Sequence, residues 1–237
     1  MNPEILYEDA YLVLVNKPSN CLVHHSKYAE NKRHERSVCQ WIEQNFDWKP
    51  NLVHRLDYKT SGILLIAKAS KHVPAIQELF TKQTVEKTYL ALVRGHTPPE
   101  GRIDSPVKNE RGNYKEALSS YSTLQHFELA IPVPPYAQSR YSLIKFQPHT
   151  GRTNQLRIHA NKISHPMIGD PKFGNRHHNH MFQAEMQIPY LFLHASNIRF
   201  VHPFTQQTLE IEAPKPDFWD KFLRHPKLKL IPQDTLI

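Results

Sequence analysis

The alternation of apolar and polar positions predicts a chain built mainly of short β-strands. Residues 5–7 and 11–16 are strand-like runs on either side of Glu8-Asp9-Ala10, which makes them candidates for a hairpin. Residues 63–67 form an uninterrupted apolar run, as expected of a strand buried on both faces. Further strands are predicted at residues 88–93, 140–146, 190–200 and 209–211, the last two as the arms of a second hairpin.

Apolar residues at helical spacing predict fewer helices than strands. Ser37 is placed to cap the first helix, and its apolar face carries Val38, Trp41, Ile42 and Phe46. The other predicted helices begin at Ser70, near Thr153 and at Asp217. In the helix from Ser70, Val73, Ile76, Leu79 and Phe80 have the spacing that turns one face toward a core, and near Thr153 we expect Leu156 and Ile163 to face inward.

Three stretches show no such pattern. Residues 28–35 are polar and predict a loop, and residues 104–115 are polar without periodicity. The prolines of residues 131–136 remove hydrogen-bond donors that a central strand needs, so this stretch predicts a rigid extended segment.

Strands that outnumber helices and neighbour one another in sequence predict an α+β fold. We expect a mixed, largely antiparallel central sheet flanked by helices. At 237 residues the chain is long enough for one large domain or two small ones. Because no repeat, low-complexity tract or linker divides it, we expect a single domain over residues 1–237.

Composition and charge favour a soluble protein with an acidic partner. The formal net charge is +8, and no apolar stretch is long enough to span a membrane, which leaves nucleic acid or an anionic membrane surface as partners. The two cysteines, Cys21 and Cys39, form no metal-binding or disulfide pattern. The first residues lack the features of a secretory signal, so we expect a cytoplasmic protein.

The most informative stretch is the polar loop His54-Arg55-Leu56-Asp57-Tyr58-Lys59-Thr60-Ser61-Gly62, which precedes the apolar run. Asp57 is the one acid among several cations, so it should stay ionised and available as a nucleophile or base. A turn in which the Asp57 side chain bonds the backbone is the alternative, and the loop alone favours it.

Four blocks in this order resemble the RluA family of pseudouridine synthases. The first is HRLDYKTSG at residues 54–62. The others are KTYLALVRG at 87–95, GRTNQLRIH at 151–159 and GDPKFG at 169–174, with a final Leu-His-Ala at 193–195. The resemblance covers nearly the whole chain and implies the catalytic fold of that family, without the S4-type module that many relatives carry in front.

The resemblance implies that the chain converts a uridine in RNA to pseudouridine. The N1–C1′ bond breaks, the base turns, and C5 joins C1′ as the C5 proton leaves. Nothing is oxidised or added, so we expect neither a metal nor an organic cofactor. By resemblance Asp57 is the catalytic carboxylate, Tyr89 packs against the base and assists at C5, and Arg157 pairs with the aspartate.

A uridine inside folded RNA has to be flipped out of its stack to reach such a site. The resemblance places Arg55 in the vacated stack, and Leu193 in the apolar wall against the uracil. Substrate or RNA contacts are also expected from His54, Lys59, Thr60 and Arg152.

Two positions depart from the family pattern. Asn154 stands where histidine is usual, and Phe173 where tyrosine is frequent. Both departures put local RNA contacts in doubt rather than the chemistry. The histidine-rich run at residues 177–180 holds no cysteine or carboxylate partner for a metal, so we expect an exposed loop that faces RNA.

Within the family, the chain resembles the TruC-type branch, the tRNA pseudouridine-65 synthases. The predicted partner is therefore tRNA, with 23S ribosomal RNA as the alternative. We expect the chain to act as a monomer that needs no protein partner and no membrane. A non-catalytic RNA-binding module would not need Asp57, Tyr89 and Arg157. A glycoside-type hydrolase usually employs two carboxylates, whereas the matched motifs offer one.

Overall fold

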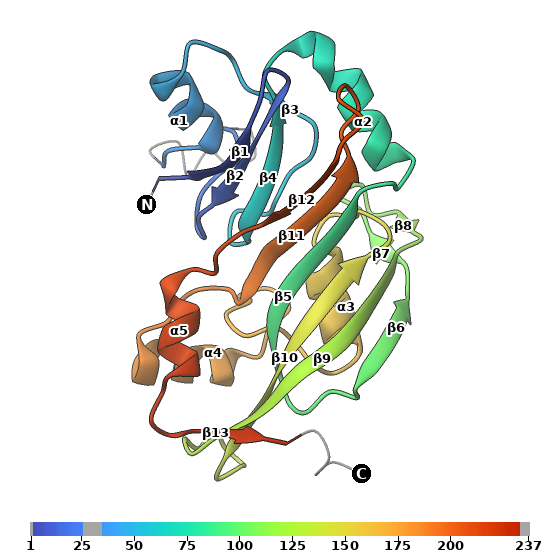
Figure 1. Cartoon of the computed structure of the whole chain (residues 1–237). Coiled ribbons are helices and arrows are strands. Elements are labelled where there is room, and N and C mark those ends of the chain that lie inside the picture. The colour runs from blue at the N-terminus through green and yellow to red at the C-terminus, as the bar shows by residue number, and fades with distance from the viewer. Residues whose placement is uncertain (1, 26–34, 233–237) are drawn as a thin grey trace. The chain divides into compact units, whose positions relative to one another are not determined.

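The computed structural model (Figure 1) describes residues 2–25 and 35–232. They form two compact units that are interleaved along the sequence. Unit 1 takes the chain up to Lys87 together with Ala195–Lys215, and unit 2 takes Thr88–His194 together with the chain from Pro216 on. The polar stretch at 28–35 lies, except for Glu35, outside the described residues. That residues 1–237 act as a single domain stays a prediction.

Unit 1 is built on a sheet that contains both predicted hairpins. Its main strands, in spatial order, are β1 (Glu4–Glu8), β2 (Leu12–Lys17), β4 (Ser61–Ala67) and β11 (Leu193–Val201). β1 and β2 pair antiparallel, as do β2 and β4. The short β3 (Asn51–Leu52) pairs with β4, and β12 (Thr208–Glu212) pairs with β11. All seven residues of β4 are buried, as its continuous apolar run predicts.

The helices of unit 1 begin where the sequence predicts. α1 (Val38–Asn45) is capped by Ser37, whose side chain accepts the Gln40 N–H while the Gln40 side chain accepts the Ser37 N–H. The 3₁₀ turn η2 (Ser70–His72) leads into α2 (Val73–Thr81). α2 buries Ile76 in a core with residues of β2, β4 and β11, among them Leu14, Leu65 and Phe200.

Unit 2 is also built mainly on antiparallel strands. Its main strands, in spatial order, are β5 (Glu86–Arg94), β10 (Ser139–Pro148), β9 (Leu118–Leu129) and β13 (Leu228–Ile231). β10 pairs antiparallel with β5 and with β9, and β6 (Glu100–Asp104) also pairs with β9. A separate two-stranded ladder joins β7 (Val107–Lys108) and β8 (Tyr114–Lys115). The predicted α+β class with a largely antiparallel sheet is confirmed.

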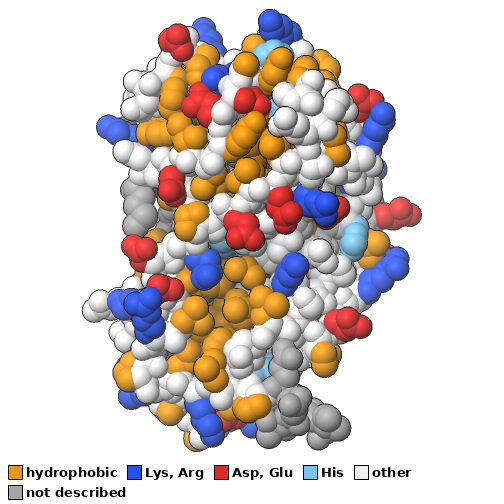
Figure 2. Space-filling model, viewed as in Figure 1, with side chains coloured by type: hydrophobic (Ala, Val, Ile, Leu, Met, Phe, Trp, Pro, Cys, Tyr) orange, Lys and Arg blue, Asp and Glu red, His pale blue; other side chains and the backbone are white. Residues whose placement is uncertain are grey.

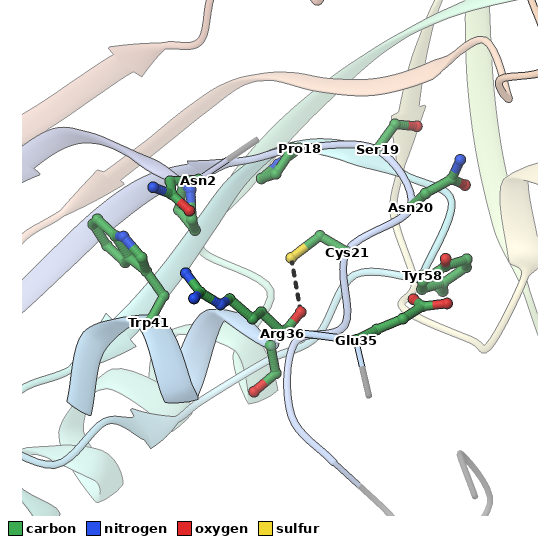
Figure 3. A pocket seen from close by; sticks show the side chains of 11 residues that line it. Asn2, Pro18, Ser19, Asn20, Cys21, Glu35, Arg36, Trp41 and Tyr58 are labelled. Atoms are coloured by element: carbon green, nitrogen blue, oxygen red, sulfur yellow. Dashed lines mark hydrogen bonds between the residues drawn. The ribbon is translucent and has the colours of Figure 1, made fainter. Parts of the chain in front are cut away.

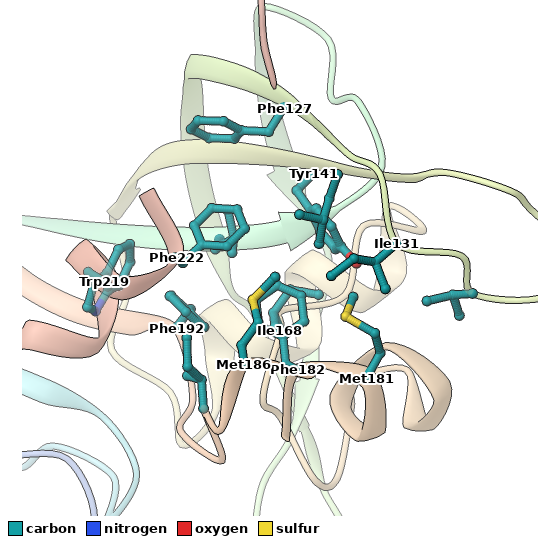
Figure 4. Packing of buried hydrophobic residues seen from close by; sticks show 14 residues of the cluster. Phe127, Ile131, Tyr141, Ile168, Met181, Phe182, Met186, Phe192, Trp219 and Phe222 are labelled. Carbon is teal, nitrogen blue, oxygen red and sulfur yellow. The ribbon is translucent and has the colours of Figure 1, made fainter. Parts of the chain in front are cut away.

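Helices and two apolar cores complete unit 2. The helices are α3 (Gln155–Lys162), α4 (Arg176–Met186) and α5 (Asp217–Leu223). Side chains alternate along β5, so Leu92 belongs to one core while Ala91 and Val93 belong to the other. Figure 4 shows the first core, in which Phe182 of α4, Phe192 and Phe222 of α5 pack together. Within the described residues no helix is long and apolar enough to cross a bilayer.

The histidine-rich run at 177–180 was predicted to be an exposed loop, and this is wrong. It belongs to α4, which Asn175 caps by accepting the N–H groups of His177 and His178. His178 is buried, and its Nδ1 lies 2.8 Å from the hydroxyl of Tyr141 in β10. Within residues 2–25 and 35–232, no three His, Cys, Asp or Glu side chains are grouped as metal ligands.

We expect the stability of the fold to decrease as the pH falls from about 6.5 to 4, in part through His178. Burial lowers the pKa of His178 to about 4, so the unfolded chain binds more protons than the folded chain in that window. Folding therefore loses on the order of 3 kcal/mol across it. Thermal unfolding at a series of pH values should show a flatter slope for His178→Gln than for wild type. The exposed neighbour gives the control, His177→Gln, and equal slopes in all three proteins would contradict the assignment.

Candidate active site

The loop between β3 and β4 presents Asp57 from unit 1. A tight turn begins at this residue, because the Thr60 N–H donates to the Asp57 carbonyl oxygen at 3.1 Å. The Asp57 side chain is partly exposed, whereas Thr60 is buried. The loop is therefore an ordered turn in which Asp57 is partly exposed.

The last residue of β2 and the residues that follow this strand hold the loop through its backbone. The Cys21 N–H and the Lys17 ammonium group both donate to the carbonyl oxygen of Tyr58, each at 3.2 Å. The Ser19 hydroxyl donates to the carbonyl oxygen of Lys59 at 2.6 Å. The two residues directly after Asp57 are thus fixed by three hydrogen bonds that do not use the Asp57 side chain.

Gly62 ends the loop at a position that only glycine fits. Its φ is +106°, and a Cβ there would overlap the backbone of Ala195 in β11. The glycine of the first motif therefore allows β4 and β11 to lie close together. This closeness fixes where β4 begins, and hence where the Asp57 loop ends.

His54 has a structural contact in the same loop. Its Nε2 accepts the Leu65 N–H of β4 at 2.9 Å, and its ring stacks on Phe80 of α2. Burial and the nearby Lys87 lower the pKa of His54 to about 3, so the ring is neutral and can act as this acceptor. That His54 also contacts RNA stays a prediction.

A cavity of about 420 Å³ lies beside the loop, between residues 18–21 and the start of α1 (Figure 3). Trp41, Arg36 and Glu35 line it together with Tyr58 of the Asp57 loop. The Cys21 thiol donates to the Arg36 carbonyl oxygen across a distance of 3.7 Å. Burial and a hydrogen bond with Glu35 raise the pKa of the Tyr58 phenol, so Tyr58 stays protonated.

Tyr89 lies in unit 2, on β5. It pairs in register with Phe146 of β10 and is half-buried against the core that contains Ala91 and Val93. Leu193 is a buried member of the same core. Both side chains therefore have a packing role in unit 2, and their predicted contacts with a uracil stay predictions.

Arg157 of α3 forms a buried ion pair with Asp170. Its Nε and Nη2 donate to the two carboxylate oxygens at 2.7 and 2.8 Å. Burial alone would raise the pKa of Asp170, but hydrogen bonds from Arg157 and from the N–H groups of Phe173 and Lys172 outweigh it and lower the pKa. The predicted pairing of Arg157 with Asp57 joins residues of different units and stays a prediction.

Asn154 and Phe173, the two residues that depart from the family pattern, both contact this arginine. The Asn154 side-chain oxygen accepts the Nη1 hydrogen of Arg157 at 2.6 Å, and the Phe173 ring centroid lies 5.3 Å from the guanidinium carbon. Asn154 has a φ of +58°, a conformation that asparagine tolerates better than most residues. Together with Asp170, these residues fix the orientation of the guanidinium plane.

The remaining polar residues of the third motif attach α3 to the sheet. Gln155 donates to the Leu118 carbonyl oxygen and to the Ser119 hydroxyl, both in β9. His159 lies within hydrogen-bond distance of Ser119 and of the Ser105 carbonyl oxygen. Arg152 is exposed and donates from Nε to the Glu116 carbonyl oxygen. Residues that precede and follow Arg157 in the sequence thus anchor α3, and with it Arg157, to neighbouring parts of unit 2.

Of the residues predicted to contact RNA, Arg55 and Arg152 are exposed and Lys59 is partly exposed. On the face shown in Figure 2, the described lysine and arginine side chains are interspersed with carboxylates and do not gather in one basic patch. The RNA contacts of these residues stay predictions.

A family model described as RNA pseudouridylate synthase matches residues 11–162, which include the Asp57 loop, Tyr89 and Arg157. The chain belongs to this family. This confirms the family that the motifs predicted, and it places Lys17 and the loop that it holds inside the matched region.

Relatives of this synthase family match over nearly the full chain. A protein named tRNA pseudouridine synthase C from Haemophilus influenzae is 36% identical over 231 residues, which cover 93% of this chain and 96% of that protein. Its namesake from Vibrio cholerae is 37% identical, covering 93% and 94%. These relatives are therefore similar to this chain in length.

Solved structures of synthase relatives share the fold. Human RNA pseudouridylate synthase domain containing 1 matches with a TM-score of 0.71 and 26% identity, covering 91% of this chain and 84% of that one. Human RNA pseudouridylate synthase domain containing 4 matches with a TM-score of 0.70 at 22% identity, which bears on the fold alone.

Two side chains that the sequence did not single out support the candidate residues. Asp170 was noted only as part of a motif, although it holds Arg157. Lys17 directly follows the predicted strand 11–16 and drew no prediction, although it is fully buried and donates to the Asp57 loop. The one signal that could have identified Lys17 is the presence of a charged residue at a position of β2 whose side chain points into the protein.

Proposed function

We propose that this chain isomerises a uridine of tRNA to pseudouridine. The observation that carries the proposal is the match, over more than nine-tenths of the chain, to proteins named tRNA pseudouridine synthase C. The fixed backbone of the Asp57 loop supports it, because a carboxylate that attacks a sugar or removes a proton has to be held in a defined place. The target uridine is position 65, at the base of the acceptor stem.

In this proposal Asp57 is the carboxylate that reacts, and Tyr89 and Arg157 complete the catalytic set. Asp57 initiates cleavage of the N1–C1′ bond, the uracil turns in place, and C5 forms the new bond to C1′. The C5 proton then passes to solvent, with Tyr89 beside the base. Arg55, Lys59, Thr60, Arg152, His54 and Leu193 contact the flipped nucleotide or the adjacent backbone of the RNA.

The cytoplasm is the proposed place of the reaction, with the chain acting as a monomer without an obligate protein partner. Cys21 and Cys39 are both free thiols, which a reducing compartment favours. Tight binding of RNA by the +8 chain should weaken as salt rises, because counterions are released on binding.

Carbodiimide labelling followed by primer extension tests the function and the substrate together. We expect incubation of unmodified tRNA transcripts with the protein to create a new stop at uridine 65, because carbodiimide adducts persist on pseudouridine. A stop only in 23S ribosomal RNA would overturn the tRNA substrate. No stop in either RNA, together with tight RNA binding, would instead favour a non-catalytic RNA-binding module.

A further inference from the structure

Residues 104–115, a polar stretch without periodicity in the sequence, include a small ordered hairpin of unit 2. β7 and β8 form a two-stranded sheet of their own. The side chain of Asn109 closes the turn between them, because its Oδ1 accepts the N–H groups of Arg111 and Asn113 at 3.0 and 2.9 Å. The β7–β8 hairpin, residues 107–115, therefore has a defined shape although most of its residues are exposed.

The β7–β8 hairpin is attached to α3, beside which it lies in Figure 1. Lys162, the last residue of α3, donates to the hydroxyl of Ser105 just before the hairpin. Arg152, which precedes α3, donates from Nε to the carbonyl oxygen of Glu116 just after the hairpin, at 3.0 Å. The same helix carries Arg157, so the hairpin and this arginine belong to one framework within unit 2.

Tyr114 of β8 presents its ring to solvent. Its exposed fraction is 68%, and it belongs to none of the apolar cores of the described residues. The Nζ of Lys108, the residue opposite it in β7, lies over the ring at 6.0 Å from the centroid. A cation in this place attracts the ring electrostatically and holds it. The ring is therefore both oriented and accessible to a further stacking partner.

Three exposed cations accompany this ring, namely Lys108, Arg111 and Lys115. In the part of the chain that the structure describes, none of them forms an ion pair with a carboxylate. They outnumber the two carboxylates of the same stretch, Glu110 and Glu116. An exposed aromatic ring among cations is suited to unstacked RNA, because bases stack on the ring while phosphates contact the cations.

We propose that the β7–β8 hairpin is a second contact surface for the substrate RNA, in which Tyr114 stacks on an unpaired base and the three cations bind the phosphates beside it. This inference rests on the proposed function, since the RNA that it names is the substrate of that reaction. Flipping a uridine out of a helix leaves neighbouring bases without a stacking partner, and an aromatic ring replaces that partner. Because the hairpin is already ordered, binding costs it little conformational entropy.

Filter binding of unmodified tRNA transcripts at a fixed salt concentration tests the stack. We expect Tyr114→Ala to weaken binding by at least about fivefold, the lower end of what stacking of one base on an aromatic side chain contributes. Tyr114→Phe keeps the ring face and should bind like wild type. Equal affinities of Tyr114→Ala and wild type would overturn the proposal, and so would a Tyr114→Phe variant that binds as weakly as Tyr114→Ala.

Tyr136→Ala is the matched control for the stack. Tyr136 is another exposed tyrosine of unit 2, with an exposed fraction of 61%. It follows the last residue of β9, whereas the hairpin precedes the first, and a strand of 12 residues is roughly 40 Å long. We expect the wild-type affinity. An equal loss of affinity in Tyr136→Ala would contradict a specific role of Tyr114.

The salt dependence of tRNA binding tests the three cations. Each phosphate contact contributes roughly 0.7–0.9 to the slope of the logarithm of the binding constant against the logarithm of the salt concentration. The triple variant Lys108→Gln/Arg111→Gln/Lys115→Gln should therefore have a slope shallower than that of wild type by about 2 to 3. An unchanged slope would overturn the phosphate contacts and with them the proposed surface.

A second triple variant, Lys221→Gln/Lys227→Gln/Lys229→Gln, is the control for net charge. It removes the same charge from exposed positions of unit 2, from α5 to β13. We expect this variant to keep the wild-type slope. The same reduction in both triple variants would reflect the net charge of the protein alone and would contradict a contact at the hairpin.

These binding measurements do not depend on catalysis, so the two possible failures can be told apart. A wild type that forms no pseudouridine in the labelling experiment would overturn the proposed function, while the salt slopes would still report whether the hairpin contacts RNA. A wild type that forms pseudouridine, with hairpin variants that bind tRNA equally well, would overturn this inference alone.

Discussion

Asp57→Asn is expected to abolish pseudouridine formation while leaving tRNA binding largely intact. The amide keeps the shape of the side chain but is neither a nucleophile nor a base, so the rate should drop by at least about a thousandfold. Single-turnover release of tritium from uridine labelled at C5 measures the reaction, because the C5 hydrogen leaves when the new bond forms. Filter binding with the same tRNA measures the affinity.

The anchoring of the loop makes this an interpretable substitution. The hydrogen bonds from Lys17, Cys21 and Ser19 go to backbone oxygens of the loop, so the variant should fold like wild type. Asp47→Asn, at an exposed position after α1, is the control and should retain full activity. If Asp57→Asn released tritium at the wild-type rate, Asp57 would not be the reacting carboxylate.

Arg157→Met is expected to destabilise the protein by about 3–5 kcal/mol, because it leaves the carboxylate of Asp170 buried without its cation. Asp170 is 1% exposed, and the substitution removes both of the hydrogen bonds that Arg157 donates to it. Urea unfolding at neutral pH measures the change. Arg176→Met, at the exposed start of α4, should change the free energy of unfolding by no more than about 0.5 kcal/mol.

A double-mutant cycle separates the ion pair from the other contacts of Arg157. Asp170→Asn keeps an oxygen for the Lys172 and Phe173 N–H groups, so the double variant Arg157→Met/Asp170→Asn should lose less stability than the two single losses combined. Additive losses would show that the pair contributes little. Further loss of rate in the folded Arg157→Met protein would support a catalytic role beside the structural one.

Elements with a strong local pattern could be predicted from the sequence. The buried run of β4, the two hairpins of unit 1 and the Ser37 cap of α1 each depend on residues that neighbour one another along the chain. The motif residues could be found in the same way, since each block is continuous. Local periodicity and capping therefore account for most of the secondary structure of unit 1.

Elements with buried polar residues could not be predicted in this way. β9 buries Ser119, Thr123 and His126, which interrupts the apolar alternation that signals a strand. The Ser119 hydroxyl binds Gln155 and His159, partners that lie far along the chain. α4 was missed for the same reason, because His178 is buried through its contact with Tyr141. Tertiary hydrogen bonds decide these positions, and no local pattern reports them.

The supports of the candidate site belong to this second class. Arg157 and Asp170 are 13 positions apart, and nothing in the spacing indicates that they pair. Lys17 has the same difficulty, since a lysine at the end of a strand is ordinarily solvated. Sequence motifs identified the residues predicted to react, whereas the residues that hold them became visible only in the structure.

The interleaving of the two units has a consequence for synthesis on the ribosome. β4 emerges early, but its neighbour β11 (Leu193–Val201) follows only after nearly all of unit 2. At roughly 5–20 residues per second, the apolar edge of β4 waits roughly 6 to 26 seconds without its partner strand. An unpaired edge of this kind promotes aggregation of nascent chains. Chaperone capture during translation should therefore centre on Ser61–Ala67.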